Sequence, residues 1–315
     1  MRPAIAATCL PALLALAPAA GALPRISAVA CFSGDAPPAL AQAWTLSPLL
    51  LPPALFALLY FAGVVRLWTR AGVGRGISVA EAGAFLAGAA VFFLATAWPL
   101  DAYGAWSLAA HMGQHMLLLA VAPPLLLAGR PVAGIAHALP RGWARQLHAW
   151  TGPTHRCLAD RLGPATLAHV AVLVLWHVPA AIAIALTDPL LHFAMHLAFL
   201  LAGLWFWMAV WHRIREPQVG AGAGLVALVT VTMVMGFTGA LLTFAPRILY
   251  PAYALRAPQI GLDPLADQQL AGLLMWVPSC LPYLAGGLWL LVHGFGRLRR
   301  RIGGATAGPS AGGVS

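Results

Sequence analysis

Five histidines placed within apolar stretches are the residues of this chain best suited to chemistry. His111 and His115 stand four residues apart, as do His192 and His196, and His177 lies in a third apolar stretch. A spacing of four puts both imidazoles of a pair on one face of a helix. Because ionisable side chains inside a membrane segment are costly, they indicate function by default. We therefore take all five as candidate metal ligands.

The depth of these histidines along their helices indicates which of them share one site. At about 1.5 Å per residue, His115, His177 and His196 each lie roughly 12 to 16 Å below the outer end of a helix. His111 and His192 form a shallower tier above them. Imidazole suits copper, zinc and iron, while thioether sulfur favours Cu(I). Methionines stand beside the histidines at Met112, Met116 and Met195. The pattern predicts a buried Cu(I) site, with His115, His177 and His196 converging in the outer half of the membrane.

Two other interpretations of the histidines stay open at this point. Facing histidines can also ligate haem axially, which would make the protein a membrane cytochrome. Alternatively, the imidazoles only form hydrogen bonds and the protein is a scaffold without metal. His169, His212 and His293 are expected at cytoplasmic helix ends, where an interfacial role is the simpler interpretation.

The composition shows what must position these side chains. Of 315 residues, 61% are hydrophobic and only 8% charged, whereas a soluble chain carries about 25% charged residues. Seven stretches reach the roughly 20 apolar residues that a helix needs to cross the hydrocarbon layer. They are Leu46–Trp68, Val79–Leu100, Leu108–Gly129, Pro164–Thr187, Leu190–Trp211, Ala221–Ala245 and Leu270–Val292. We predict an all-α, polytopic membrane helix bundle with about seven transmembrane helices after an N-terminal signal-like segment.

The distribution of arginine predicts domain organisation and orientation. Residues 1–41 are interpreted as a signal peptide or an extra apolar span, 42–296 as the membrane domain, and 297–315 as a basic, then disordered, cytoplasmic tail. Fourteen of the 18 basic residues, all arginine, fall on one side of the predicted spans. By the positive-inside rule that side is cytoplasmic. The chain is therefore expected in a bacterial inner membrane, with the mature N-terminus in the periplasm and the C-terminus in the cytoplasm.

Smaller features refine this arrangement. Pro179 is expected to kink the fourth span and free a backbone carbonyl beside His177. Small residues at Gly83, Gly88 and Gly203 are expected to permit close helix contacts. The loop 130–163 is amphipathic in places, with tryptophans among arginines, and is expected to lie along the inner membrane surface.

Several classes of function are excluded by what the sequence lacks. The net charge of +10 comes from arginines in short loops and forms no basic face for nucleic acid. The four cysteines lie in four different segments with no CxxC pair, which argues against a thiolate zinc site and a disulfide framework. There is no phosphate-binding loop, dinucleotide fingerprint, HExxH or GxSxG motif, and the acidic residues flank the predicted spans. We therefore do not expect an enzyme.

The histidine segments resemble a known family. The stretch HMGQHMLL at 111–118 is similar to the signature of the CtaG-type, multi-span cytochrome c oxidase assembly factors. The rest of the family pattern resembles five further segments: WHVP at 176–179, His192 with His196, WFW at 205–207, DPLADQQLAG at 263–272 and MWVP at 275–278. The resemblance covers roughly Trp44 to Val292. It implies a membrane protein that helps assemble a haem-copper oxidase, with copper supply to an oxidase subunit as its suspected role. Ser279 and Cys280 depart from the pattern, where a small residue such as glycine is usual.

Overall fold

The computed structural model describes residues 25–26, 37–216 and 220–292. Most of the predicted signal segment and the whole predicted tail therefore lie outside the described residues. The described chain is almost entirely helical, and its one sheet pairs the two-residue strands β1 (Arg25–Ile26) and β2 (Thr45–Leu46) in parallel. The predicted all-α membrane bundle is confirmed.

Six helical segments of the described chain are long and apolar enough to cross a membrane, and the number is seven if one bent pair of helices is counted as a single span. Their helices are α2 (Leu51–Ala71), α3 (Val79–Thr96) with α4 (Leu100–Gly104), α5 (Leu108–Met116) with the π-helical turn η3 (Leu117–Val121) and α6 (Ala122–Ala128), α11 (Pro189–Arg215), α12 (Ala221–Thr243), and α14 (Pro264–Trp276), whose span continues to Val292. The bent pair consists of α8 (Arg141–Asp160) and α9 (Leu162–Trp176).

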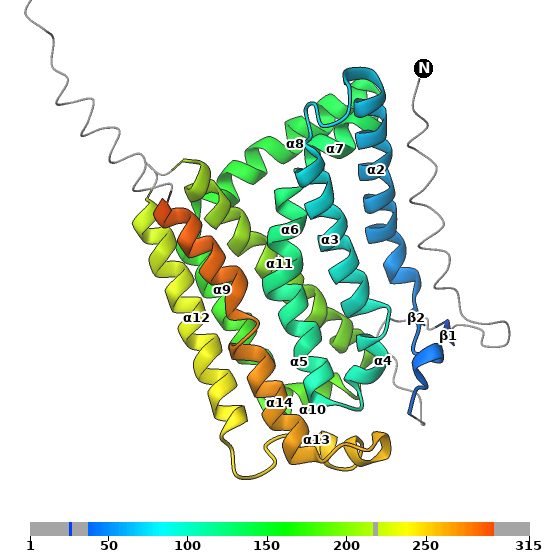
Figure 1. The fold of residues 1–315 in the computed structure, drawn as a ribbon, viewed down its shortest axis with the longest axis vertical. Helices are drawn as coiled ribbons and strands as arrows, with labels where there is room; N and C mark the ends of the chain where they lie inside the picture. The colour runs from blue at the N-terminus through cyan, green and yellow to red at the C-terminus, as the bar shows by residue number, and fades with distance from the viewer. Residues whose placement is uncertain (1–24, 27–36, 217–219, 293–315) are drawn as a thin grey trace, which may run out of the picture.

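Shorter elements join these spans. They are the 3-10 turns η1 (Leu40–Gln42) and η2 (Pro48–Leu50) before α2, α7 (Pro131–Ala138) before α8, α10 (Pro179–Ala185) after α9, and α13 (Pro251–Ala254) with η5 (Ala257–Ile260) before α14. In Figure 1, α7 and α8 lie at the top, and α10 and α13 lie at the bottom. We call the α7–α8 end the arginine-rich end, because most of the described arginines lie there, in α8 and near the ends of α2 and α11.

The fourth predicted span is broken rather than continuous. The stretch expected as Pro164–Thr187 forms α9 and α10, separated at His177 and Val178. Pro179 has no N–H and disfavours helical backbone before it, so the helix cannot run through. The His177 N–H bonds to Val174 O at 3.3 Å, and this leaves Leu173 O free of its usual backbone donor. The predicted kink is confirmed.

The third span is interrupted by a π turn directly after its histidines. Pro123 cannot donate a backbone hydrogen bond to Leu119 O, four residues earlier. That oxygen instead lies against α11, where a Cβ added to Gly203 would meet it at 2.6 Å. A Cβ added to Gly88 would similarly lie 2.9 Å from Leu126 N, whereas a Cβ added to Gly83 would meet no atom within 4 Å. The predicted close helix contacts are therefore confirmed at Gly88 and Gly203, and the prediction was wrong for Gly83.

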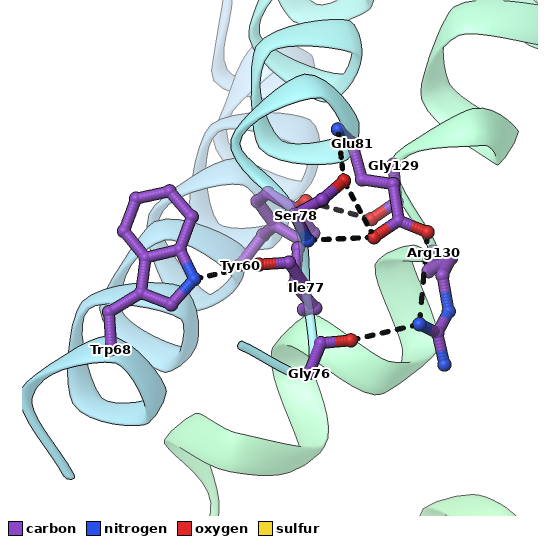
Figure 2. Close-up of polar contacts among 8 residues, drawn as sticks. All are labelled: Tyr60, Trp68, Gly76, Ile77, Ser78, Glu81, Gly129 and Arg130. Atoms are coloured by element: carbon purple, nitrogen blue, oxygen red, sulfur yellow. Dashed lines mark hydrogen bonds and ion pairs between the residues drawn. The ribbon is translucent and has the colours of Figure 1, made fainter. Parts of the chain in front are cut away.

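The arginine-rich end is tied together by the polar contacts of Figure 2. Tyr60 on α2 donates to Gly129 O at 2.7 Å, and Arg130 donates to Gly76 O at 2.9 Å. Arg130 also lies 3.7 Å from the Glu81 carboxylate at the start of α3. These contacts join the α2–α3 loop to the corner between α6 and α7, and so hold the first two spans against the third.

The predicted amphipathic loop forms α7 and α8. The axis of α8 is bent by 80° from that of α9, and α8 crosses the end of the bundle in Figure 1. Trp143 and Trp150, seven residues apart on one face, are 69% and 70% exposed. A helix with exposed tryptophans among arginines is suited to a membrane surface.

Candidate metal centre

All five predicted histidines gather at the end of the bundle opposite the arginine-rich end. None is more than 6% exposed. The ring centroids of His111 and His115 are 4.4 Å apart, and those of His192 and His196 are 4.6 Å apart. Between the helices, His111 stacks on His192 at 5.1 Å, and His115 lies 5.5 Å from His196 and 5.6 Å from His177. Three separate helical segments therefore contribute to one imidazole cluster.

Within this cluster, His111, His115 and His196 form the group that could share one ion. Their candidate ligand nitrogens all lie within 4.8 Å of one another. The expectation from depth alone was a group of His115, His177 and His196. His177 does border His115, but its Nδ1 is 2.6 Å from Leu173 O, the carbonyl freed by the helix break.

The helices that carry these residues begin with side-chain caps one turn before the first histidine. Ser107 accepts a hydrogen bond from Ala110 N–H at 3.1 Å at the start of α5. Asp188 accepts bonds from Leu190 N–H and Leu191 N–H at the start of α11, at 2.9 and 3.2 Å. Such caps satisfy backbone donors that a helix start leaves without intrahelical partners. They hold the first turns of both helices, and with them the outer histidines, in place.

A buried carboxylate adds a second restraint on α5. Asp267, on α14, accepts hydrogen bonds from Ser107 Oγ and Leu108 N–H, both at 2.6 Å, and from Ala109 N–H at 3.3 Å. It is 4% exposed, and Asp101 is 3% exposed. Asp101 and Glu81 lie in the span Val79–Gly104, and Asp267 lies in Pro264–Val292, so the expectation that the acidic residues only flank the spans was wrong for these three. The DPLADQQ motif contains Asp267, but its partner Ser107 lies 160 residues away in the sequence. Only the fold could therefore show that the two residues are in contact.

A tyrosine orients the first histidine. Tyr253 on α13 donates its hydroxyl proton to Gly104 O at 2.9 Å, and its oxygen lies 2.6 Å from His111 Nδ1. Nδ1 also lies 3.2 Å from Gly104 O, which can only accept, so Nδ1 carries the proton and the lone pair of His111 stands on Nε2. Burial raises the pKa of the Tyr253 phenol well above its ordinary value, so the proton stays on the oxygen.

The structure also defines the surroundings of His177 and His115. His177 Nδ1 faces a carbonyl acceptor, so Nδ1 carries the proton and the lone pair lies on Nε2. Its own carbonyl accepts from Tyr250 at 2.6 Å. Neither ring nitrogen of His115 has a hydrogen-bond partner among the described residues, and its ring stacks on Phe199 at 4.1 Å. A buried polar atom without a hydrogen-bond partner needs an explanation, and a metal ion would provide one.

The histidines outside the cluster fall into two groups. His137, His148 and His155 are exposed on α7 and α8, and His212 is 3.0 Å from Asp160. His169 was expected at an interface, and that was wrong: it is fully buried and lies 2.9 Å from the Tyr283 hydroxyl. His293 lies outside the described residues.

Comparison with known proteins gives one match. The family model described as cytochrome c oxidase caa3 assembly factor (Caa3_CtaG) matches residues 58–296, which include every histidine of the cluster. Comparisons with curated proteins and with solved structures gave no match.

Proposed function

The chain belongs to the family of cytochrome c oxidase caa3 assembly factors, and on that premise we propose that it carries Cu(I) for the oxidase. In this proposal the buried histidines hold the ion in the cytoplasmic membrane of a bacterium and pass it to an oxidase subunit. The ion is cargo and no covalent step is needed, so the role is non-enzymatic. The observation that carries the proposal is the meeting of His111, His115 and His196.

The spacing of this group fits a bound ion after small movements. Three nitrogens at about 2.0 Å from a central metal lie about 3.5 Å from one another. The three candidate atoms are within 4.8 Å of one another, so each needs to move inward by about 0.8 Å at most to reach that bond length. Side-chain rotation can supply this without moving a helix.

The surroundings favour a monovalent ion over a divalent one. No carboxylate belongs to the group, so three neutral imidazoles would face the ion's full charge. Moving charge from water into an apolar interior is unfavourable, and more so for a doubly charged ion. Met112 and Met195 are fully buried beside the histidines on the same helices, and Met116 nearly so. Thioether sulfur is a ligand that Cu(I) accepts readily.

The two flanking histidines provide a route for ligand exchange. His192 stacks beside His111, and the ring centroid of His177 lies 5.6 Å from that of His115. An ion leaving the group could therefore exchange one imidazole for another without meeting water. Delivery within the membrane would suit a haem-copper oxidase, which keeps its catalytic copper below the outer surface.

The test is anaerobic titration of the purified protein with Cu(I) against a chromophoric chelator. We expect tight binding of one ion per chain, and His115→Ala should weaken it by about 100-fold or more, since losing a ligand exceeds the usual effect of losing an outer-shell partner. The exposed His137 provides the matched control, because His137→Ala removes an imidazole from α7 and should leave the affinity unchanged. Equal affinities for wild type and His115→Ala would contradict the proposal.

Oxidase assembly in cells separates copper carriage from the other two interpretations. His115→Ala or His196→Ala should lower oxidase activity while the protein stays in the membrane, and added copper should partly restore it by mass action. A scaffold predicts oxidase loss that follows loss of folded protein and ignores copper. A cytochrome predicts a haem absorbance spectrum in the purified protein. Full oxidase activity in a strain with alanine at His115, His177 and His196 under scarce copper would refute copper carriage.

A further inference from the structure

A groove at the arginine-rich end has no part in the proposed copper function. It has a volume of about 700 Å³ and lies between α9 and α12. Its walls combine the first turn of α9 with apolar side chains further along both helices, including Leu167 and Val226, which are 70% and 67% exposed. At its arginine-rich end it is lined by Arg161 and Arg213. The groove is thus basic at one end and apolar along its length.

Arg213 is buried in the wall of this groove with donor capacity to spare. It is 6% exposed, and its guanidinium donates to Ala159 O, to Asp160 O at 2.8 Å and to Ala209 O at 3.0 Å. A guanidinium has five N–H groups, and Nε has no hydrogen-bond partner in the described part of the chain. The three acceptors named are backbone carbonyls, and the Asp160 carboxylate nearby offsets part of the positive charge of the guanidinium.

Two further features give the same end of the groove an affinity for anions. The first turn of α9 lines it, and that helix starts without a side-chain cap or an acidic residue. The N–H groups that this helix start can offer an oxyanion are those of Leu162 and Gly163, because Pro164 has none, and the helix dipole adds a partial positive charge. Arg161 is exposed directly before that turn. One carboxylate, Asp160, also lines the groove; its side chain is 62% exposed and lies 3.0 Å from His212, and its single negative charge reduces but does not cancel the charge of the two arginines.

We propose that this groove binds an anionic phospholipid of the leaflet on the arginine-rich side. Its phosphate lies at Arg161, Arg213 and the start of α9, and an acyl chain lies between α9 and α12. Basic pockets between membrane helices recognise lipid headgroups in this way. The apolar length of the groove favours a lipid over a soluble anion, because a free phosphate would use only the basic end.

The test is native mass spectrometry of the delipidated full chain in detergent. Dioleoyl phosphatidylglycerol, dioleoyl phosphatidylcholine and inorganic phosphate are the probes. We expect one phosphatidylglycerol per chain to bind more tightly than phosphatidylcholine. Arg161→Gln should weaken phosphatidylglycerol about tenfold, as expected for losing one charge-assisted hydrogen bond. Arg70→Gln removes the same charge from the end of α2, away from the groove, and should change nothing.

A second variant tests the apolar part of the groove without touching a charge. Ala223 is exposed and lines the groove, so Ala223→Trp should fill it and lower phosphatidylglycerol binding while the melting temperature holds. Equal binding of the two lipids, or equal losses in Arg161→Gln and Arg70→Gln, would overturn the proposal. Displacement of the lipid by millimolar inorganic phosphate, with no effect of Ala223→Trp, would overturn it in favour of a soluble anion.

Discussion

Replacement of Asp267 by alanine tests how the histidine cluster is held in place. This carboxylate accepts from Ser107 Oγ and from two backbone N–H groups at the start of α5. Asp267→Ala removes all three acceptor contacts and the negative charge beside the positive end of the helix. His111 lies only one turn further along, so the effect should reach the metal ligands.

The size of the effect follows from the contacts. A hydrogen bond to a charged group contributes about 1.5–3 kcal/mol, and an unsatisfied buried donor costs about 1–3 kcal/mol. Two of the bonds are short, at 2.6 Å, and the third is long, at 3.3 Å. The Ser107 hydroxyl can turn to another acceptor, so the backbone donors dominate. We expect a loss of about 3–5 kcal/mol, or about 6–15 °C in melting temperature for a chain of this size.

The measurement is thermal unfolding in detergent at one fixed scan rate, followed by Cu(I) titration of the folded protein. Asp263 provides the matched control, because it is an exposed N-cap of α14, the helix that carries Asp267, and accepts a hydrogen bond from Ala266 N–H at 2.8 Å. Asp263→Ala should cost only about 1 kcal/mol, as for an ordinary helix cap. It should also leave copper affinity unchanged, whereas Asp267→Ala should weaken it.

The comparison between these two variants decides the matter. If Asp267→Ala melts within about 2 °C of Asp263→Ala, the buried contacts do not hold α5 as argued. Unchanged Cu(I) affinity in Asp267→Ala would show that the contacts of Asp267 with the start of α5 do not hold the histidines in position.

Three further predictions concern the same bundle. Tyr253→Phe removes the closer of the two partners of His111 Nδ1 and leaves Gly104 O at 3.2 Å, so it should lower Cu(I) affinity about tenfold, the lower end of the usual effect of losing such a partner. Tyr103→Phe is the control, and equal affinities in the two variants would count against an oriented imidazole. Gly203→Leu should destabilise the protein by more than about 2 kcal/mol, because the new Cβ would meet the backbone oxygen of Leu119. Gly83→Ala is the control in the same thermal unfolding assay, and it should be neutral or stabilising because nothing lies within 4 Å of the added Cβ. A reporter fused to the C-terminus and active only in the periplasm should be inactive, because the arginine asymmetry predicts a cytoplasmic C-terminus; activity would refute that orientation.

The length of the apolar stretches and the spacing of residues along the chain were enough to predict the helical spans and the pairing of histidines within each helix. A helix is a local structure, so hydrophobic runs were enough to predict the spans, and Pro179 was enough to predict the break in the fourth. The i and i+4 histidine pairs required no tertiary information either, because both members of a pair stand on one helix face. The motif around His111 also identified the family that the comparison later showed.

What the sequence could not decide is how the helices rotate and pack against one another. Depth along an axis placed His115, His177 and His196 at one level, but ring orientation gave His111 the place expected for His177. Burial of His169 and the contact of Gly203 with a neighbouring backbone, absent at Gly83, depend on which helix faces meet. The pairing of Asp267 with the start of α5 joins segments about 160 residues apart. Such contacts follow from packing between whole helices, and no local pattern carries that information.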